Sequence, residues 1–264
     1  MLFVLVEQRA VAVRSGATSD DRSLWLAAML IPWLAQSLLQ FRSGPAVDGA
    51  SVAIVSIGND AGDLDSLASS IAIADWQPIG GCDGRPLWMP VAPFARCDFR
   101  LRQDACLLFD HLGFTMDEFG APVELLYLDE AEDAALSGRW RDAGGLGLAL
   151  VDHNACVPGV AAAFGERVVA IVDHHNDEKR HDPASEAAGA ADDALAAMLR
   201  GSPPLRVVDP AMGSTCSLLA ERMDVVPPTG SGGLSAHSAE LRTLLLSAIA
   251  VDCRGFDPQL LGEK

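Results

Sequence analysis

The stretch SVAIVSIGNDAGDLDS, residues 51–66, joins three patterns that indicate a class of fold. Its first seven residues form a short apolar run rich in Val and Ile, which is typical of a strand buried on both faces. Gly, Asn and Asp then mark a turn, and helical spacing begins at about residue 64. A buried strand that runs through a short turn into a helix is the unit of α/β proteins with parallel sheets.

The same alternation continues along the chain. Further apolar runs at 87–91, 123–128, 147–151, 167–172 and 205–208 predict strands. Helical spacing predicts helices at about 64–75, 99–113, 155–164, 188–200 and 214–223, with an earlier helix at about 22–41 and a last one at about 236–251. Polar stretches at 176–187 and 225–235 predict surface loops. We therefore predict a doubly wound, mainly parallel sheet with helices on both faces.

Composition restricts the classes of function. Half of the 264 residues are apolar, which is ample for a large core. No apolar run reaches the roughly 18 to 20 uninterrupted residues that a membrane span needs. The formal net charge of −17 disfavours nucleic-acid binding through a basic face. Six cysteines without a CxxC pair, and no secretory signal pattern, favour the cytoplasm, with an organellar matrix as the alternative.

Acidic side chains gather where the predicted strands and helices end. They are Asp63 and Asp65 after the first strand, Asp152 in VDHN, Asp173 in VDHH and Asp252 at the end of the last helix. Parallel strands bring such ends to one edge of the sheet, where several carboxylates would repel unless cations hold them. Oxygen ligands with one or two imidazoles suit Mg, Mn or Co, and two such ions can activate a water for attack on phosphorus. The pattern predicts hydrolysis of a phosphate ester or anhydride.

Taken singly, each of these residues has a plainer interpretation. Asp63 and Asp65 suit the start of a helix through capping and the helix dipole. Asp152 and Asp173 suit turns at strand ends, and two adjacent histidines suit an exposed surface. The coincidence at four separate strand or helix ends favours the metal site.

The motifs GNDAGDLDS, VDHN, VDHH, GSTCS and the AVD before Cys253 resemble, in order and spacing, those of the DHH phosphoesterase superfamily. Asn59, where many members have His, and the stretch at 86–114, PLWMPVAPFARCDFRLRQDACLLFDHLGF, are similar to the eukaryotic exopolyphosphatase and prune branch. The resemblance covers about residues 22–256, which we expect to form a DHH domain after an N-terminal tail at 1–21.

The resemblance implies a set of metal ligands. Asp63 is implied for one cation and Asp65 for the other, with Asp152 bridging them. His174 is the implied imidazole ligand, and Asp252 the last carboxylate of the second metal. The implied cofactors are two divalent cations, Mn²⁺ or Mg²⁺, with Co²⁺ as a further option.

The resemblance also implies catalytic and substrate-binding residues. Asn59 takes the place of a histidine ligand, His175 is similar to a residue that contacts phosphate, and Asp173 is expected to orient the imidazole pair. Ser214 and Thr215 open a helix whose N–H groups suit a phosphate, although a plain N-cap explains them equally well.

The implied activity is release of terminal phosphate from inorganic polyphosphate. The alternatives are pyrophosphate or cyclic-nucleotide hydrolysis by the same kind of site, or a prune-like binding or scaffold protein with weak catalysis. Relatives carry a second, C-terminal domain with basic residues that grip substrate, and we expect residues 257–264 to be a truncated extension in its place. The expected partner is a small phosphate-containing substrate, with neither nucleic acid nor membrane, and the sequence assigns no oligomeric state.

Overall fold

The computed structural model describes residues 30–45, 52–77, 86–131, 134–143, 145–184, 194–199, 205–225 and 238–256. The expected tail at 1–21, the first part of the helix expected at about 22–41 and the extension at 257–264 lie outside these residues. So do most of the loop at 225–235 and the first half of the helix expected at about 188–200.

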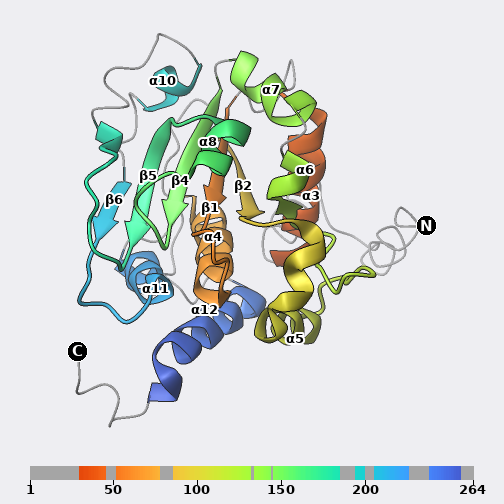
Figure 1. Ribbon diagram of the computed structural model, residues 1–264, viewed down its shortest axis with the longest axis vertical. Helices are drawn as coiled ribbons and strands as arrows, with labels where there is room; N and C mark the ends of the chain where they lie inside the picture. The colour runs from red at the N-terminus through yellow and green to blue at the C-terminus, as the bar shows by residue number, and fades with distance from the viewer. Residues whose placement is uncertain are drawn as a thin grey trace, which may run out of the picture.

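Six parallel strands form one sheet (Figure 1). They are β1 (Ala53–Ile57), β2 (Leu87–Ala92), β3 (Leu126–Tyr127), β4 (Leu146–Val151), β5 (Val168–Asp173) and β6 (Leu205–Val208). Their order is β3-β2-β1-β4-β5-β6, and every neighbouring pair is parallel. The chain winds outward in both directions from β1 and β4, so the point where the winding reverses lies between these two strands. The doubly wound parallel sheet is confirmed, and such sheets bind ligands at that point, beyond the carboxyl ends of the strands.

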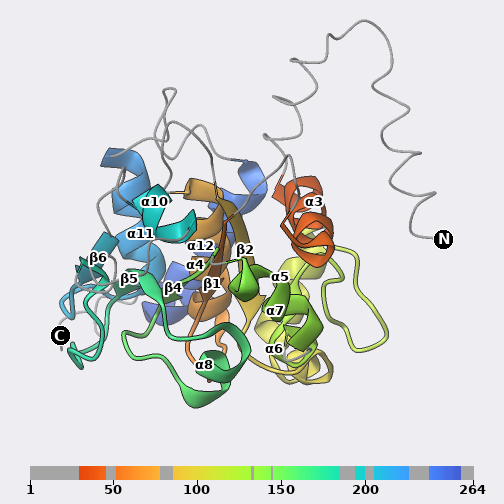
Figure 2. The same ribbon diagram turned by 90° about the horizontal axis from the view of Figure 1, so that it is seen from above.

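Helices cover both faces of the sheet (Figure 2). One layer contains α4 (Leu64–Trp76), α11 (Thr215–Val225) and α12 (Ala239–Asp252), which contact one another. The other contains α6 (Leu128–Ala131), α7 (Ala134–Asp142) and α8 (Pro158–Phe164), while α3 (Leu30–Ser43) lies beside β2. The other helical elements among the described residues are η1 (Arg96–Leu101), α5 (Gln103–Leu112), α10 (Ala194–Leu199) and η3 (Arg254–Phe256).

Side chains of β1 enter both cores in alternation, because successive residues of a strand point to opposite faces. Ile54 belongs to the core with Leu67 and Leu244, and Val55 to the core with Trp140 and Phe164. All five residues of β1 are buried, which explains why the sequence shows an uninterrupted apolar run there.

The structure differs from the expected elements at three places. The strand expected at 123–128 has two residues, since the buried Glu124 side chain accepts from the Thr115 N–H and draws the chain before it into a turn. The helix expected at 99–113 is split at Arg102, whose φ of −109° and ψ of 75° are not helical. We predicted no helices at α6 and α7. Among residues 128–131 and 138–142 of these helices, only Ala131 and Trp140 are buried. The helical spacing of apolar residues that predicts a helix is therefore weak there.

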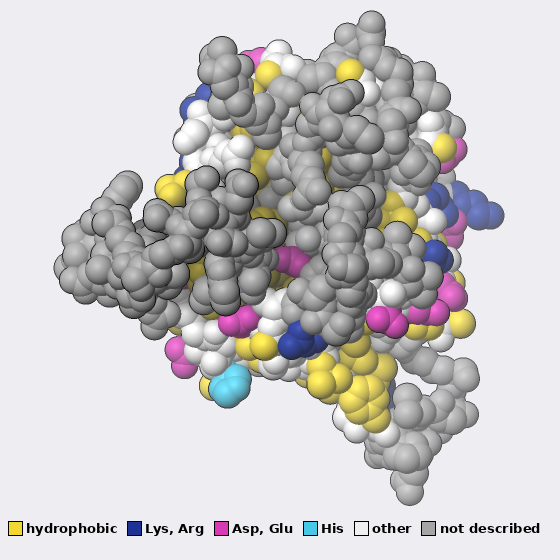
Figure 3. Space-filling model, turned by 180° about the vertical axis from the view of Figure 1, so that it is seen from behind, with side chains coloured by type: hydrophobic (Ala, Val, Ile, Leu, Met, Phe, Trp, Pro, Cys, Tyr) yellow, Lys and Arg dark blue, Asp and Glu magenta, His cyan; other side chains and the backbone are white. Residues whose placement is uncertain are grey.

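The described surface is mixed in character. Figure 3 shows apolar side chains gathered near the lower edge of one face, with basic and acidic side chains beside them. The exposed large apolar residues include Leu101, Leu107 and Leu246. Within the described ranges, we find no helix with the length and apolar character that crossing a membrane requires.

Candidate metal centre

The turn after β1 brings an amide side chain to the edge of the sheet. Asn59 donates a hydrogen bond from Nδ2 to Oδ2 of Asp152 at 2.8 Å, and its Oδ1 accepts from the N–H groups of Ala61 and Gly62. Gly62 has a φ of +57°, and a Cβ there would lie 2.4 Å from the Phe94 ring. Only glycine suits this position, because both the backbone conformation and the ring contact exclude a side chain. Asn59 therefore holds the turn and a carboxylate together.

The two aspartates that follow have different surroundings. Asp63 is the N-cap of α4, and its Oδ1 accepts from the Ser66 N–H at 2.9 Å. Asp65 is 1% exposed and accepts from the N–H groups of Thr215 at 2.6 Å and Cys216 at 2.9 Å, at the start of α11. Burial raises the pKa of both carboxyls. Asp63 thus caps its own helix, whereas Asp65 ties two helices together.

Asp152 lies at the centre of the cluster, directly after β4. Its Oδ2 accepts from the Ser66 hydroxyl at 2.7 Å, and its Oδ1 accepts from the Thr215 hydroxyl at 3.2 Å and lies 3.3 Å from Nε2 of His174. Burial disfavours its ionised form, but the bonds from His174 and Ser66 outweigh burial and lower the pKa of Asp152. This carboxylate is therefore charged at neutral pH.

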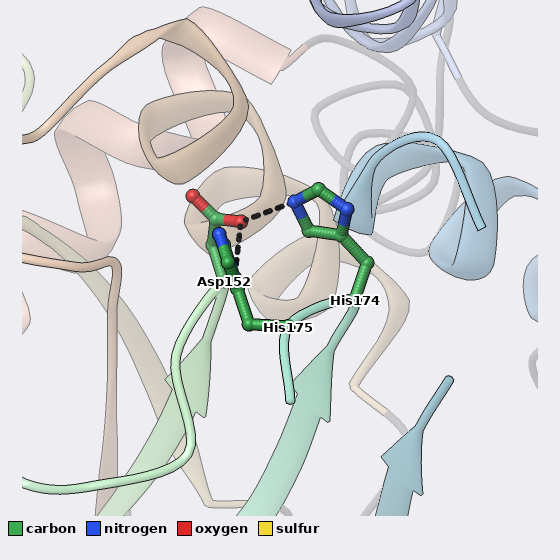
Figure 4. Close-up of side chains that lie close together, drawn as sticks. All are labelled: Asp152, His174 and His175. Carbon is green, nitrogen blue, oxygen red and sulfur yellow. Dashed lines mark ion pairs between the residues drawn. The ribbon is translucent and has the colours of Figure 1, made fainter. Parts of the chain in front are cut away.

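Two imidazoles after β5 turn towards Asp152 (Figure 4). Burial disfavours a charged His174 ring, but its hydrogen bond to Asp152 and the nearby carboxylates raise the pKa of His174 to about 9. Nδ1 of His174 lies 3.3 Å from the carbonyl oxygen of Met212. Nδ1 of His175 lies 2.8 Å from Oδ1 of Asp173 and 3.7 Å from Oδ1 of Asp152, and the His175 side chain is 53% exposed. Asp173 thus fixes the ring of His175, while a backbone carbonyl holds that of His174.

Asp252, the last residue of α12, faces the same cluster. Ligand atoms of Asp65, His174 and Asp252 lie within 4.8 Å of one another, and so do those of Asp152, His174 and His175. Burial raises the pKa of Asp252 to about 7, and neighbouring carboxylates add to this effect. The described residues therefore form two potential ligand groups that share His174.

This donor set fits oxygen-preferring divalent cations. Both groups combine carboxylate oxygens with imidazole nitrogens, as Mg²⁺ and Mn²⁺ sites do. Burial raises the pKa of the nearby Cys216 thiol well above its usual value, and this sulfur belongs to neither ligand group. Burial and the repulsion from neighbouring carboxylates both disfavour the ionised form of Asp252, and a bound cation would offset both effects.

The predicted ligands divide between these groups. Asp65, Asp152, His174 and Asp252 occur in them, and Asp63 occurs in neither within the described part of the chain. His175, which we expected to contact substrate, is a member of the second group. The ligand roles themselves stay predictions.

Ser214 and Thr215, expected to bind phosphate, are fully buried. Both the N–H and the hydroxyl of Thr215 donate to carboxylates, of Asp65 and Asp152, and Oγ of Ser214 accepts from the Ser217 N–H. These polar groups thus have protein partners in the absence of substrate, and a phosphate contact through them stays a prediction. Thr215 holds the two carboxylates in place, while Ser214 caps its own helix through Ser217.

Ser66 and Arg102 also contact the site, and the sequence analysis gave neither a role. The Ser66 hydroxyl donates to Asp152, and Arg102 donates to the carbonyl oxygens of Ala61 and Gly62. Ser66 lies within the GNDAGDLDS motif, so its position was a signal. Nothing local in the sequence connects Arg102 to a turn 40 residues away.

A cavity of about 240 Å³ lies beside the centre and shares Asn59 with it. Its lining also includes His153, Glu178 and Arg180. Nδ1 of His153 lies 2.9 Å from the carbonyl oxygen of Val151, and its Nε2 has no hydrogen-bond partner among the described residues. The histidine of the VDHN motif thus lines this cavity and joins neither ligand group.

Comparison with known proteins gives sequence relatives with a shared name. The chain is 27% identical over 206 residues to the exopolyphosphatase PRUNE1 of Rattus norvegicus, and 28% identical over 204 residues to that of Bos taurus. The matches cover 78% and 77% of this chain but 37% and 36% of the relatives, so the chain spans little more than a third of their length. No family model matches. The similarity confirms the resemblance to the exopolyphosphatase and prune branch of the DHH phosphoesterases.

Two solved structures are also similar. A putative family II inorganic pyrophosphatase of Methanococcus jannaschii has a TM-score of 0.43 and 20% identity, over 80% of this chain and 52% of its own. An exopolyphosphatase-related protein of Bacteroides fragilis has a TM-score of 0.45 and 15% identity, over 85% of this chain and 51% of its own.

Proposed function

We propose that this chain carries the metal centre of a phosphoanhydride hydrolase, and that its substrate is a short inorganic polyphosphate from which terminal phosphate is released. The observation that carries the proposal is the pair of ligand groups sharing His174, at the carboxyl ends of β4 and β5 beside the winding reversal. The sequence relatives named exopolyphosphatase support the reaction class.

The ligands we propose are Asp65, Asp152, His174 and Asp252, with Asp63 close enough for its charge to act on Asp252. Two divalent cations, Mn²⁺, Mg²⁺ or Co²⁺, would supply charge neutralisation and activation of a water for attack on phosphorus. Hydrogen bonds from Ser66 and Thr215 fix the orientation of Asp152, and those from the start of α11 fix Asp65. Ligands held in this way keep their positions without reorganising when substrate arrives.

His175 is the residue we propose to contact the transferring phosphate. Oδ1 of Asp173 only accepts, so the proton of the neutral ring resides on Nδ1 and Nε2 is free to face substrate. When the ring is charged, Nε2 donates to a phosphate oxygen and stabilises the charge that develops there. Asp173, which is fully buried and also accepts from the Asn154 amide, keeps the ring in this orientation.

The proposed preference for short chains follows from charge. A net charge of −17 repels a long polyanion at a distance, and two bound cations change it only to −13. Repulsion grows with the number of phosphates that extend beyond the centre. Pyrophosphate and short polyphosphates are therefore repelled least.

We further propose that residues 22–256 form one DHH domain. The described residues from 30 to 256 contribute to one sheet and the helices that cover it, in keeping with this proposal. The boundaries stay predictions.

The experiment is a phosphate-release assay with Mn²⁺, Mg²⁺ or Co²⁺ on pyrophosphate, polyphosphates of increasing length and cyclic AMP. We expect metal-dependent release that weakens with chain length, and loss of release in Asp152→Asn. The matched control is Asp209→Asn, because Asp209 also follows a strand of the sheet, β6, but belongs to neither ligand group. Equal loss in both variants would contradict the assigned site.

The same assay separates the alternatives. Turnover confined to pyrophosphate or to cyclic AMP would replace polyphosphate as the substrate while keeping the centre. Cation binding without turnover of any substrate would favour the binding or scaffold protein.

A further inference from the structure

The guanidinium of Arg102 contacts the turn that precedes α4. Nε donates to the carbonyl oxygen of Gly62 at 2.6 Å, and Nη2 donates to that of Ala61 at 2.5 Å. A third bond, from Nη1 to the carbonyl oxygen of Asp98 at 3.1 Å, fixes the guanidinium to its own segment. Its Cζ lies 3.5 Å from the centre of the Phe94 ring. All three donor nitrogens of the guanidinium therefore have partners.

These contacts close the turn from the outside. From the inside, Asn59 accepts from the N–H groups of the same two residues, Ala61 and Gly62. The turn is thus held through its N–H groups on one side and its carbonyl groups on the other. Gly62 also packs against Phe94, the ring that the guanidinium covers.

The turn decides where three groups of the centre lie. Asn59 at its start holds Asp152 with an amide hydrogen bond. Asp63 at its end caps α4, and Asp65 in the first turn of that helix belongs to a ligand group. A shift of the turn would therefore move ligands on both sides of the cluster, although the Arg102 side chain itself donates only to backbone carbonyl oxygens within the described part of the chain.

We propose that Arg102 is a positioning residue for the metal centre, which holds the turn at 59–63 in the conformation that cations require. The inference rests on the proposed metal centre and concerns how it is built. Only arginine has the planar fork that reaches two neighbouring carbonyl groups while a third nitrogen holds another and the plane stacks on a ring. Lysine would keep the charge near Asp63, but its donors all lie on one nitrogen and cannot span the two carbonyl groups as a planar fork does.

The chain offers a matched control in Arg96. Its guanidinium also makes several hydrogen bonds, to Glu130, Asp117 and the Leu125 carbonyl oxygen, and lies 4.3 Å from the centre of the Tyr127 ring. It is thus a partly buried, stacked and multiply bonded arginine like Arg102, but its partners are not part of the turn or of either ligand group. Loss of either arginine should destabilise the fold to a similar extent.

The experiment measures Mn²⁺ affinity by titration calorimetry, without substrate, in the wild type and in the variants Arg102→Gln, Arg102→Lys and Arg96→Gln. The thermal unfolding midpoint of each variant is measured in chelator as well. All titrations are run below the lowest of these temperatures. We expect Arg102→Gln to weaken Mn²⁺ binding by about 10- to 100-fold, as loss of a group that orients ligands typically does. Arg102→Lys should recover part of the affinity, and Arg96→Gln should leave it unchanged at a similar loss of stability.

The outcomes are distinct. Mn²⁺ affinity in Arg102→Gln equal to that of the wild type, or lowered equally in Arg96→Gln, would overturn the positioning role. No Mn²⁺ binding by the wild type would instead overturn the proposed function on which the inference rests. If Arg102→Gln does not fold, Arg102→Lys against Arg96→Lys gives the same comparison, and equal Mn²⁺ affinity in these two variants would reject the proposal.

Discussion

Without cations, the protein should become less stable as the pH rises from 5 to 9. Two groups of the centre have pKa values that are raised into this pH range, Asp252 to about 7 and His174 to about 9. Each binds a proton more tightly in the folded chain than in the unfolded one. Stability from such a group is complete below its unfolded pKa and is lost as the pH rises through its folded pKa. The window therefore begins below pH 5 for Asp252 and lies between 6.5 and 9 for His174.

The magnitude follows from the two shifts. A tenfold change in proton affinity corresponds to about 1.4 kcal/mol, and solvent screening of the partly exposed Asp252 reduces its share to about 1 to 2 kcal/mol. The contribution of His174 to the free energy of unfolding includes its interaction with Asp152. After the same reduction for solvent screening, we expect it to be about 2 kcal/mol. The free energy of unfolding should thus fall by about 3 kcal/mol between pH 5 and pH 9 in chelator.

Urea unfolding at pH 5, 7 and 9 measures this change, in chelator and with excess Mn²⁺. The general repulsion from a net charge of −17 also changes with pH, and the variant Asp252→Asn provides the baseline that includes it. We expect the variant to lose the part of the fall between pH 5 and 7. At a fixed concentration, Mn²⁺ should restore stability most at pH 9, where deprotonated ligands bind it most tightly. The gain is about 2.7 kcal/mol where that concentration is 100 times the dissociation constant. The same slope in wild type and variant would refute the reasoning.

Three further predictions concern single side chains. Asp152→Ala should abolish cation binding measured by calorimetry, whereas Asn59→Ala should only weaken it, because a neutral amide is a poor ligand; equal affinities would contradict the central role of Asp152. Gly62→Ala should lower the free energy of unfolding in urea by about 1 to 3 kcal/mol, because the new Cβ meets the Phe94 ring and the positive φ adds strain; an unchanged midpoint would count against this. Asp173→Asn should lower the rate of phosphate release by about 10- to 100-fold while Mn²⁺ affinity stays within a few-fold, and a large loss of affinity would assign Asp173 to the ligands.

The sheet could be predicted from the sequence because its strands are buried on both faces. A strand such as β1, with every residue buried, leaves an apolar run that needs no partner to be recognised. The edge strand β3 has two residues, which pair with β2. The apolar run at 123–128 is longer than the paired segment, so the sequence predicted too long a strand there. Helix α7 was missed for a related reason, since Trp140 is the only buried residue among those of its residues 138–142.

The order of the motifs determined which residues to examine at the site. Asp65, Asp152, His174 and Asp252 stand at strand or helix ends in the sequence, and a parallel sheet brings such ends to one edge. Sequence position did not separate their surroundings. Asp63 and Asp65 are two residues apart, yet one caps its own helix and the other accepts hydrogen bonds from α11.

What the sequence by itself determined, then, is the alternation of strands and helices and the acidic residues at their ends, because both depend on local pattern. The tertiary structure alone decided which neighbours those residues meet. Asp65 meets the start of α11 across 150 residues, and Arg102 meets the turn at Gly62 across 40. Such contacts arise when packed helices bring hydrogen-bonding groups within about 3 Å of each other, and a linear pattern contains no record of that distance.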